Sequence, residues 1–533
     1  RTASDTEVLV EAYRAWGHEV WSRLNGFWAV ALLDLRDGAL VLSRDRPGIA
    51  PLYCREGDGR LLFSSLQRPL LDPGRPRVAR ARTRAFVDTG LKDFDRRTFF
   101  REIRSLPPAT TVVLPPGCTR VDEGRRIDYW RAPSAPLGAH ELGLDEAADR
   151  LRETLADAVR LRLRADRPVA LELSGGLDSS SLVALAARES DAPVTTWTLR
   201  VPERDEEPFA RTLRDRYDLD FRVLDGVEET FADEAHDFAA LMEEPYHAAS
   251  IYTHYRMRRR MKRAGSDVVL TGSGGDEVLA GYEWDFWPAA RRALEADGAR
   301  LQALRFHLAQ RYGTGPRARE SLEGWARWAG RSLRHPLQLA RRVAARLARP
   351  APSRPPSGAG DAPWPTGGTG DGPDPAYALH ASYPGLDYAA QRRYHLEVAQ
   401  LPYYLRSNDH FTFDLPLEHR FPFLDHRVIE LGLTMPPRHL FRDGWTKYVL
   451  RRAMEGLLPP EVLWRREKMG FPFPFRRFLR QNRPAFEPLL RRVADAGLAE
   501  PADYGALLAS DHHRLWRVCS TGLWLESGLA PRP

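Results

Sequence analysis

The segment LELSGGLDSSS (171–181) constrains the fold of this chain more than any other part of the sequence. A short apolar strand is expected before the glycines and a helix after them. Ser174, Gly175 and Gly176 allow a tight turn, so that backbone N–H groups and the positive end of the following helix face an anion. A carboxylate inside such a turn, Asp178, would repel a phosphate. Its presence indicates a divalent cation between the two, and Mg²⁺ is the simplest choice.

A second strand and glycine-rich turn with an acidic residue follows at LTGSGGDEVLAGY (270–282). The carboxyl ends of neighbouring parallel strands converge on one crevice, so Asp178 and Asp276 are expected to reach a single metal–pyrophosphate unit. One glycine turn alone is more often structural, but two turns that each carry an aspartate favour an ATP site. No GxxxxGK[ST] motif occurs in the chain. Attack at the α-phosphate, with pyrophosphate leaving, is therefore the expected chemistry.

The pattern of apolar runs and turns divides the chain into two parts. Short apolar runs broken by charged or glycine-rich turns over 26–72 predict antiparallel hairpins, and this β-rich part continues to about Trp130. Residues 131–143 have the Pro, Ala and Gly content of a linker. From Leu144 onward helices alternate with strands, which predicts a parallel sheet covered on both faces.

Length and composition agree with this division. A chain of 533 residues suggests two or three domains. The three cysteines, Cys54, Cys118 and Cys519, stand alone, so neither a metal pair nor a disulfide framework is expected, and a reducing cytoplasm fits best. Neither a membrane span nor a signal segment is expected. The net charge of +7 comes from arginine, because the chain has only four lysines.

Two later regions are predicted not to belong to the catalytic site. Residues 288–347 contain Arg/Ala/Leu helical patterns, which we interpret as solvated helix faces rather than an anionic-partner site. Residues 349–375 are dominated by Pro and Gly, and a mobile loop is expected there. Helical segments are predicted from about Tyr377 to the end of the chain.

The two glycine turns, read together, resemble the PP-loop synthetase domain of the glutamine-dependent asparagine synthetase family. The resemblance continues through YYLRSNDHFTFDLPLEHRFPFLDHRVIELGLTMPP (403–437) and GWTKYVLRRAMEGLLPPEVLWRREKMGF (444–471). Earlier, SDTEVLVEAYRAWG (4–17) and LNGFWAVALLD (24–34) resemble the later part of that family's N-terminal glutaminase domain. Matches in the same order over nearly the whole chain are more specific than any single motif.

The resemblance implies roles for individual residues. Lys468 falls where the family keeps a catalytic lysine, and a lysine retained in so arginine-rich a chain supports a role that a guanidinium cannot fill. Lys447 stays undecided between a surface and a site role, and Arg420 and Asp425 are interpreted as a structural ion pair. The implied nucleotide and metal positions are Leu173, Ser174, Gly175, Gly176, Asp178, Ser179, Ser180, Leu199, Gly272 and Gly274 for ATP, and Asp178 and Asp276 for Mg²⁺.

The sequence also departs from the family. Ser273, the second candidate catalytic position, stands where asparagine-forming members carry glutamate and β-lactam-forming relatives carry tyrosine, and serine cannot replace either as an acid or base near neutral pH. An arginine expected near Ala249 in asparagine-forming enzymes is absent. The sequence matches the glutaminase pattern only from part-way along it, without the nucleophilic cysteine. Asp5 is therefore the remaining glutamine-binding candidate. The chain as given is not expected to hydrolyse glutamine.

We therefore expect an incomplete Ntn-type glutaminase-like domain over 1–135 and an α/β PP-loop synthetase domain over 144–533. The expected reaction is adenylation of a small-molecule or peptide carboxylate, aspartate or another acid, followed by attack of ammonia or an amine. Intramolecular amide formation, as in lasso-peptide or β-lactam cyclases, stays open. So do an RNA-binding role in tRNA modification, although no RNA-binding module is found, and an inactive partner subunit. A homodimer is also open, and no membrane or nucleic-acid partner is expected.

Overall fold

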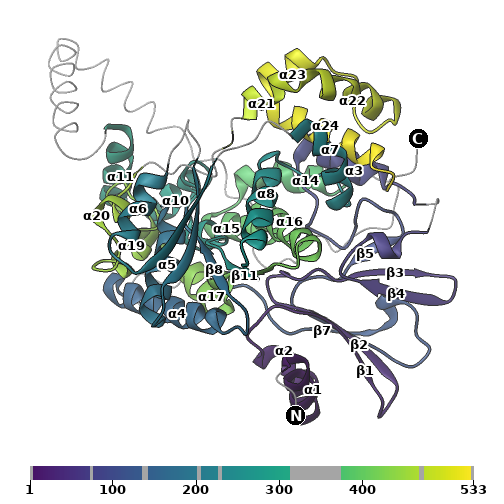
Figure 1. Cartoon of the computed structure of the whole chain (residues 1–533), viewed down its shortest axis with the longest axis horizontal. Helices are drawn as coiled ribbons and strands as arrows, with labels where there is room; N and C mark the ends of the chain where they lie inside the picture. The colour runs from purple at the N-terminus through teal and green to yellow at the C-terminus, as the bar shows by residue number, and fades with distance from the viewer. Residues whose placement is uncertain are drawn as a thin grey trace.

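The computed structural model describes residues 4–72, 76–134, 142–200, 206–225, 231–312, 374–466, 473 and 475–529. Its N-terminal part, purple in Figure 1, is built from two antiparallel sheets. One sheet has the order β1-β2-β6-β7 and the other has the order β4-β3-β5. The strands are β1 (Ala29–Asp34), β2 (Ala39–Arg44), β3 (Tyr53–Gly57), β4 (Arg60–Ser64), β5 (Ile103–Ser105), β6 (Thr110–Leu114) and β7 (Arg125–Asp128). The helices are α1 (Asp5–Trp16), η1 (Gly17–Glu19), α2 (Val20–Arg23), η2 (Arg68–Leu70), α3 (Arg80–Thr89) and η3 (Val121–Glu123).

Alternation along the N-terminal strands produces the core between these sheets. In the β1–β2 hairpin, Leu33 lies opposite Leu40 and Asp34 lies opposite Ala39. Side chains of a strand alternate between its two faces, so every second residue can be buried. The buried cluster consists of Leu42, Leu52, Cys54, Leu106, Val112, Leu114 and Val121. The hairpins predicted from the sequence over 26–72 are confirmed.

The second part is organised around a parallel sheet of order β10-β9-β8-β11-β12, in which every neighbouring pair is parallel. Its strands are β8 (Val169–Glu172), β9 (Val194–Arg200), β10 (Leu219–Asp225), β11 (Val268–Leu270) and β12 (Glu418–Arg420). The helices that alternate with them are α4 (Leu144–Leu163), α5 (Leu177–Glu189), α6 (Glu207–Arg214), α7 (Phe231–Leu241), α8 (Ser250–Arg263) and α9 (Gly275–Leu279). The predicted parallel sheet is confirmed, but the short strand β12 escaped prediction.

Helices cover both faces of this sheet, because its strands are apolar on both sides. Leu171 and Leu270 belong to a buried cluster with residues of α4 and α5. Ala170 and Val269, their neighbours in sequence, belong to a different cluster with residues of α7 and α8. Continuous apolar runs of this kind are typical of strands in parallel sheets.

The remaining helices complete the molecule. They are α10 (Glu283–Ala296), α11 (Arg300–Tyr312), α14 (Ala376–Ser382), η4 (Tyr383–Gly385), α15 (Tyr388–Glu397), α16 (Gln400–Asp414), η5 (Pro422–Leu424), α17 (His426–Thr434), α18 (Pro437–Leu440), α19 (Tyr448–Ala453), α20 (Pro460–Leu463), α21 (Phe475–Gln481), α22 (Arg483–Asp495), α23 (Tyr504–Ser510) and α24 (His512–Glu526). Of the helices described, none has both the length and the apolar composition that crossing a lipid bilayer requires.

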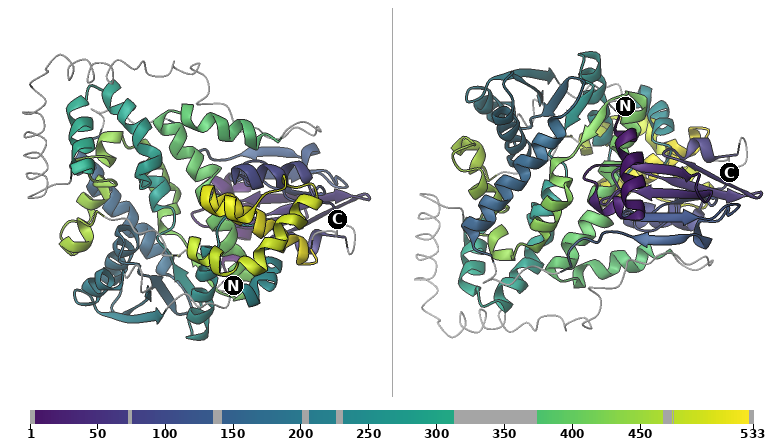
Figure 2. Two further views of the ribbon diagram at one scale, coloured as in Figure 1. Left: turned by 90° about the horizontal axis from the view of Figure 1, so that it is seen from above. Right: turned by 90° about the horizontal axis from the view of Figure 1, so that it is seen from below.

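The last helices pack back onto the N-terminal part. In both views of Figure 2, the yellow C-terminal helices lie against the purple segment. The fully buried ring of Trp524 on α24 lies 5.8 Å from that of Phe99 and 5.6 Å from that of Phe100, measured between ring centroids. The two halves of the chain therefore share one of the main hydrophobic clusters.

Three predictions need comment. The predicted ion pair between Arg420 and Asp425 is not formed, so this prediction is wrong. Among the described residues, Arg420 bonds to Glu418 and to backbone carbonyls, while Asp425 pairs with Arg162 and Arg427. The Pro/Gly-rich stretch 349–375 lies outside the described residues, apart from its last two residues. Of the helical pattern 288–347, α10 and α11 are described, and both bury an apolar face that includes Phe286 and Phe306.

Candidate functional site

The first glycine turn connects β8 to α5 and is held by its own serines. The backbone N–H of Ser174 donates to Oγ of Ser179 at 3.1 Å, and the two hydroxyl oxygens lie 3.0 Å apart. Thr198 on β9 donates to the carbonyl of Leu173 at 2.7 Å. Gly176 caps helix α5, whose first-turn N–H groups have no acceptor within the helix. The turn therefore presents the positive end of a helix to the space above the sheet.

The second turn follows β11, which is the direct sheet neighbour of β8. Oγ of Ser273 and Oγ1 of Thr271 lie 2.8 Å apart, and the N–H of Ser273 donates to the same Thr271 oxygen. A Cβ added at Gly272 would meet the backbone nitrogen of Ser179 at 3.1 Å and Cβ of Asp178 at 3.2 Å. The two turns are thus in contact, and glycine permits the close approach.

One ammonium group joins the two turns. Nζ of Lys447 lies 2.5 Å from Oδ2 of Asp178 and 2.6 Å from Oδ1 of Asp276. The lysine side chain is 6% exposed, and each carboxylate is 19% exposed. Burial alone would lower the pKa of Lys447, but the two carboxylates outweigh burial and raise that pKa. The lysine is therefore charged at neutral pH, and the turns after Leu173 and Thr271 open onto the same place.

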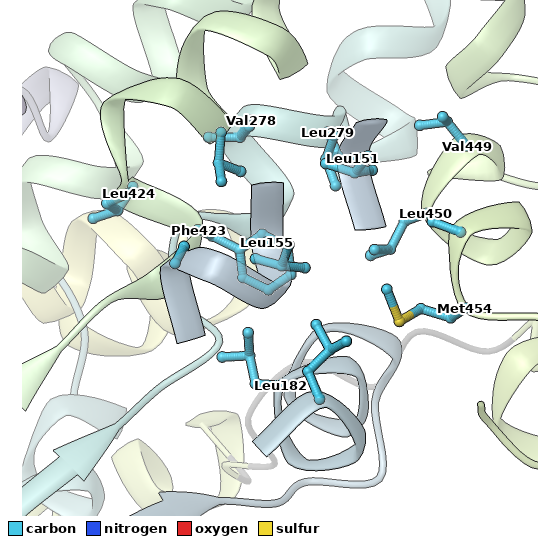
Figure 3. Close-up of a cluster of buried hydrophobic side chains, with 14 of the residues drawn as sticks. Leu151, Leu155, Leu182, Val278, Leu279, Phe423, Leu424, Val449, Leu450 and Met454 are labelled. Carbon is cyan, nitrogen blue, oxygen red and sulfur yellow. The ribbon is translucent and has the colours of Figure 1, made fainter. Parts of the chain in front are cut away.

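A hydrophobic cluster positions the elements that carry these groups. Figure 3 shows side chains of α4, α5, α9, η5 and α19 meeting in one buried cluster. Val278 and Leu279 follow Asp276 on α9, and Val449 and Leu450 follow Lys447 on α19; all four are fully buried. The positions of Asp276 and Lys447 are therefore coupled through a shared core.

The two turns form part of the wall of a cleft with a volume of about 540 Å³. Its other walls come from β9, α8, α16 and the segment from Thr446 to Arg466. The sequence-predicted residues that line the cleft are Leu173, Ser174, Gly176, Asp178, Ser179, Leu199, Gly272, Ser273, Gly274 and Asp276. Gly175 packs against α6 instead, where an added Cβ would meet the carbonyl of Glu206 at 2.9 Å, and Ser180 is buried inside α5.

Family profiles cover most of this structure. The profile described as "Asparagine synthase" matches residues 150–526, and that described as "Glutamine amidotransferase domain" matches residues 1–125. The chain belongs to the asparagine synthase family. It is accordingly an asparagine synthetase-type carbon–nitrogen ligase that uses ATP to form amide bonds.

Individual relatives agree with this family assignment. The chain is 26% identical to asparagine synthetase [glutamine-hydrolyzing] 3 of Bacillus subtilis, over 88% of this chain and 70% of that protein. Asparagine synthetase [glutamine-hydrolyzing] 1 of the same organism is 24% identical over 100% of this chain and 82% of its own length. Amidase chyE of Penicillium rubens is 27% identical over 86% of this chain and 71% of its own length.

Beyond the two turns, the cleft of this asparagine synthase family member contains a carboxylate hydrogen-bonded to a phenol. The hydroxyl of Tyr282 donates to Oε1 of Glu277 at 2.7 Å. Burial and the neighbouring Glu277 and Asp276 raise the pKa of Tyr282 well above its usual range, and burial is the main reason why the pKa of Tyr404 is raised to about 12. Both phenols are therefore neutral hydrogen-bonding groups.

Arginines also line the cleft, and Arg465 donates a 3.4 Å hydrogen bond to the carbonyl of Gly175 in the first turn. Arg465 lies 2.8 Å from Oε1 of Glu206 and stacks over the ring of Phe209, with its Cζ 4.1 Å from the ring centroid. Burial raises the pKa of Glu206 to about 7, although Arg465 opposes this shift. Arg451 lines the same wall and donates to the carbonyls of Thr446 and Leu463. These cations give one side of the cleft a positive potential.

One predicted site residue, Asp5, lies away from this geometry, and another, Lys468, falls outside the described residues. Asp5 lies in the first turn of α1 and accepts a 3.5 Å hydrogen bond from the hydroxyl of Thr6. Conversely, Lys447 was left undecided by the sequence, although the scarcity of lysine that drew attention to Lys468 applies equally to it.

Proposed function

We propose that this enzyme transfers the AMP of ATP to a substrate carboxylate and then joins the activated carbonyl to ammonia or an amine. The observation that carries the proposal is the meeting of Asp178 and Asp276, from two separate turns, at one buried cation. Such an arrangement suits the pyrophosphate end of ATP. Leu173, Leu199 and Gly272, which line the cleft, are proposed to face the nucleotide.

Mg²⁺ is the proposed metal, and the donor set suits it. Within the described ranges, no group of three or more His, Cys, Asp or Glu side chains could hold a metal alone. Mg²⁺ in nucleotide sites is usually held by one or two carboxylates together with substrate phosphates. Asp178 and Asp276 would supply the protein's share. When bound, the metal would neutralise charge on the leaving pyrophosphate.

The chain's own residues would do the rest of the adenylation step. N–H groups of the first turn and the positive end of α5 would bind the phosphates from one side. Arg451, Arg465 and Lys447, which also line the cleft, would add positive potential around the phosphates. We retain Lys468 as the proposed lysine that stabilises charge growing on the α-phosphate and on the tetrahedral intermediate.

We propose that the substrate carboxylate is an acid other than aspartate. Ser273, hydrogen-bonded to Thr271, offers no acid or base near neutral pH. Ala249, near which an arginine was expected, is fully buried and carries no charge. Another small-molecule or peptide acid is therefore favoured. Intramolecular amide formation remains the alternative, in which the amine belongs to the same substrate.

Pyrophosphate release measured across a panel of acids tests the function. The wild-type enzyme is expected to release pyrophosphate and AMP with at least one acid, and Asp178→Ala is expected to abolish the release. Asp191→Ala, an exposed aspartate beyond the far end of α5, is the matched control. If no acid stimulates release above the Asp178→Ala background, adenylation is refuted. If aspartate alone does, the reading of Ser273 is wrong.

We also propose that residues 1–135 act as a glutaminase-like, Ntn-type domain attached to a synthetase domain of residues 144–533. The two layered antiparallel sheets support this reading. Asp5 is the proposed glutamine-binding residue of that domain. Comparing glutamine, ammonium and a substrate-linked amine as nitrogen sources tests it: amide formed with glutamine supports the proposal, and amide formed only with ammonium or the linked amine contradicts it.

A further inference from the structure

Lys447 occupies the place between the two carboxylates that a bridging cation would need. Its ammonium nitrogen lies 2.5 Å and 2.6 Å from one oxygen of each aspartate. Mg²⁺ binds oxygen at about 2.0–2.1 Å. An ion at that distance from the same two oxygens would overlap the ammonium group. Lysine and metal therefore exclude each other at these two oxygens.

The surroundings hold the lysine in this place. A Cβ added at Gly281 would lie 2.2 Å from Cε of Lys447 and 1.9 Å from Oδ1 of Asp276, so bare backbone closes one side of the pair. The residue before helix α19 is Lys447 itself, with φ +51° and ψ +35°, a left-handed conformation that costs a non-glycine residue free energy. The fold maintains this conformation, and its effect is to deliver the ammonium group to the two carboxylates.

Without a cation, these two partly buried carboxylates, which now share one ammonium group, would repel each other. The nucleotide-free enzyme therefore needs a positive charge between Asp178 and Asp276 to keep the two turns together. ATP is absent from the cleft before each turnover, and a divalent cation held by two side-chain carboxylates alone is held weakly compared with one that phosphates also bind.

We propose that Lys447 is a built-in substitute for the metal: it bridges Asp178 and Asp276 in the empty enzyme and leaves them when metal and nucleotide enter together. This inference rests on the proposed function for the identity of the incoming ligand, but the exchange itself concerns only the protein and a divalent cation. The lysine delays metal binding until phosphates arrive, and its displaced ammonium then faces those phosphates.

Mn²⁺ binding to the nucleotide-free protein, followed by electron paramagnetic resonance, tests the exchange. Wild type, Lys447→Met and the control Lys262→Met are titrated with MnCl₂ at pH 8. Lys262 is a suitable control because it also pairs with one aspartate at 2.5 Å, that of Asp267, and does not line the cleft. Lys447→Met is expected to bind one Mn²⁺ at least about tenfold more tightly than wild type, since removing the ammonium leaves two unshared negative charges. Lys262→Met is expected to match wild type.

Each outcome decides the question. Equal Mn²⁺ affinity in wild type and Lys447→Met overturns the proposal. If Lys447→Met unfolds without metal, circular dichroism in millimolar Mn²⁺ is the second measurement. Refolding with Mn²⁺ supports the exchange, and failure to refold overturns it, because a cation then does not replace the lysine. None of these readouts requires adenylation. Failure of the pyrophosphate assay would therefore refute the proposed function separately.

Discussion

Substituting Gly281 by alanine should disable the site through steric pressure on Asp276, a proposed metal ligand, and on Lys447. The added Cβ would lie 2.2 Å from Cε of Lys447 and 1.9 Å from Oδ1 of Asp276, whereas ordinary contacts begin at 3.4 Å. Both groups must therefore move by more than about 1 Å. A displacement of about 1 Å at reacting groups costs on the order of 100-fold in rate. Overpacking of this kind costs about 1–3 kcal/mol in stability.

Two assays separate these effects. Acid-stimulated pyrophosphate release should fall by about 100-fold in Gly281→Ala, and thermal unfolding should show the moderate loss of stability. Gly385→Ala is the matched control, because a Cβ there meets no atom within 4 Å and its φ is not positive. If Gly281→Ala keeps activity within about twofold of wild type, contacts of this size are tolerated and the coupling of Gly281, Lys447 and Asp276 is refuted.

Three further outcomes are expected. Leu155→Ala, at a fully buried position in the cluster of Figure 3, should lower the free energy of unfolding by about 2–5 kcal/mol, measured by chemical denaturation, whereas substituting the exposed Leu301 should change it little. Asp425 is fully buried against Arg162, Arg427 and Asn25, and although burial opposes it, these partners hold its pKa well below the usual range. Its stabilisation is thus complete above the unfolded-state pKa of about 3.9 and is lost as the pH falls toward the folded-state pKa. Asp425→Ala should cost about 3–5 kcal/mol at pH 7 and flatten the loss of stability below about pH 4, and parallel curves for both proteins would contradict this. Ser273→Ala should change acid-stimulated pyrophosphate release by less than about threefold, because its hydroxyl is hydrogen-bonded to Thr271, and a larger loss would restore Ser273 as a catalytic group.

The sequence predicted those parts of the site that depend on local patterns. A strand, two or three glycines and an aspartate are adjacent in the chain, so the turns at 171–181 and 270–282 could be recognised without knowledge of contacts. Their meeting followed from the rule that carboxyl ends of parallel strands share one edge. Because β8 and β11 are direct sheet neighbours, this rule was sufficient.

The parts that escaped prediction depend on distant contacts. Lys447 reaches Asp178 across 269 positions of sequence, and no periodicity marks a residue whose role is set by such a contact. Strand β12 has three residues, Glu418, His419 and Arg420, none of them apolar, so no strand pattern exists. Asp425 was predicted to pair with Arg420, but among the described residues it pairs with Arg427, two positions along the chain, and with Arg162, which comes from α4. Long-range geometry brought Arg162 to Asp425 and Lys447 to Asp178.

The site therefore depends on the core more than on the turns themselves. Asp178, Asp276 and Lys447 come from three separate segments, and the apolar residues that flank the latter two pack in one cluster with α4 and α5. Local opening of α19 would withdraw the lysine and leave two carboxylates facing each other, which would separate the turns by repulsion. Loss of packing around Leu450 should consequently displace Lys447 from the two carboxylates before it unfolds the sheet. In a variant destabilised in this cluster, a further substitution of Lys447 should therefore change pyrophosphate release little. Both glycine turns should remain formed in that variant, since each turn is held by its own serine and threonine hydrogen bonds.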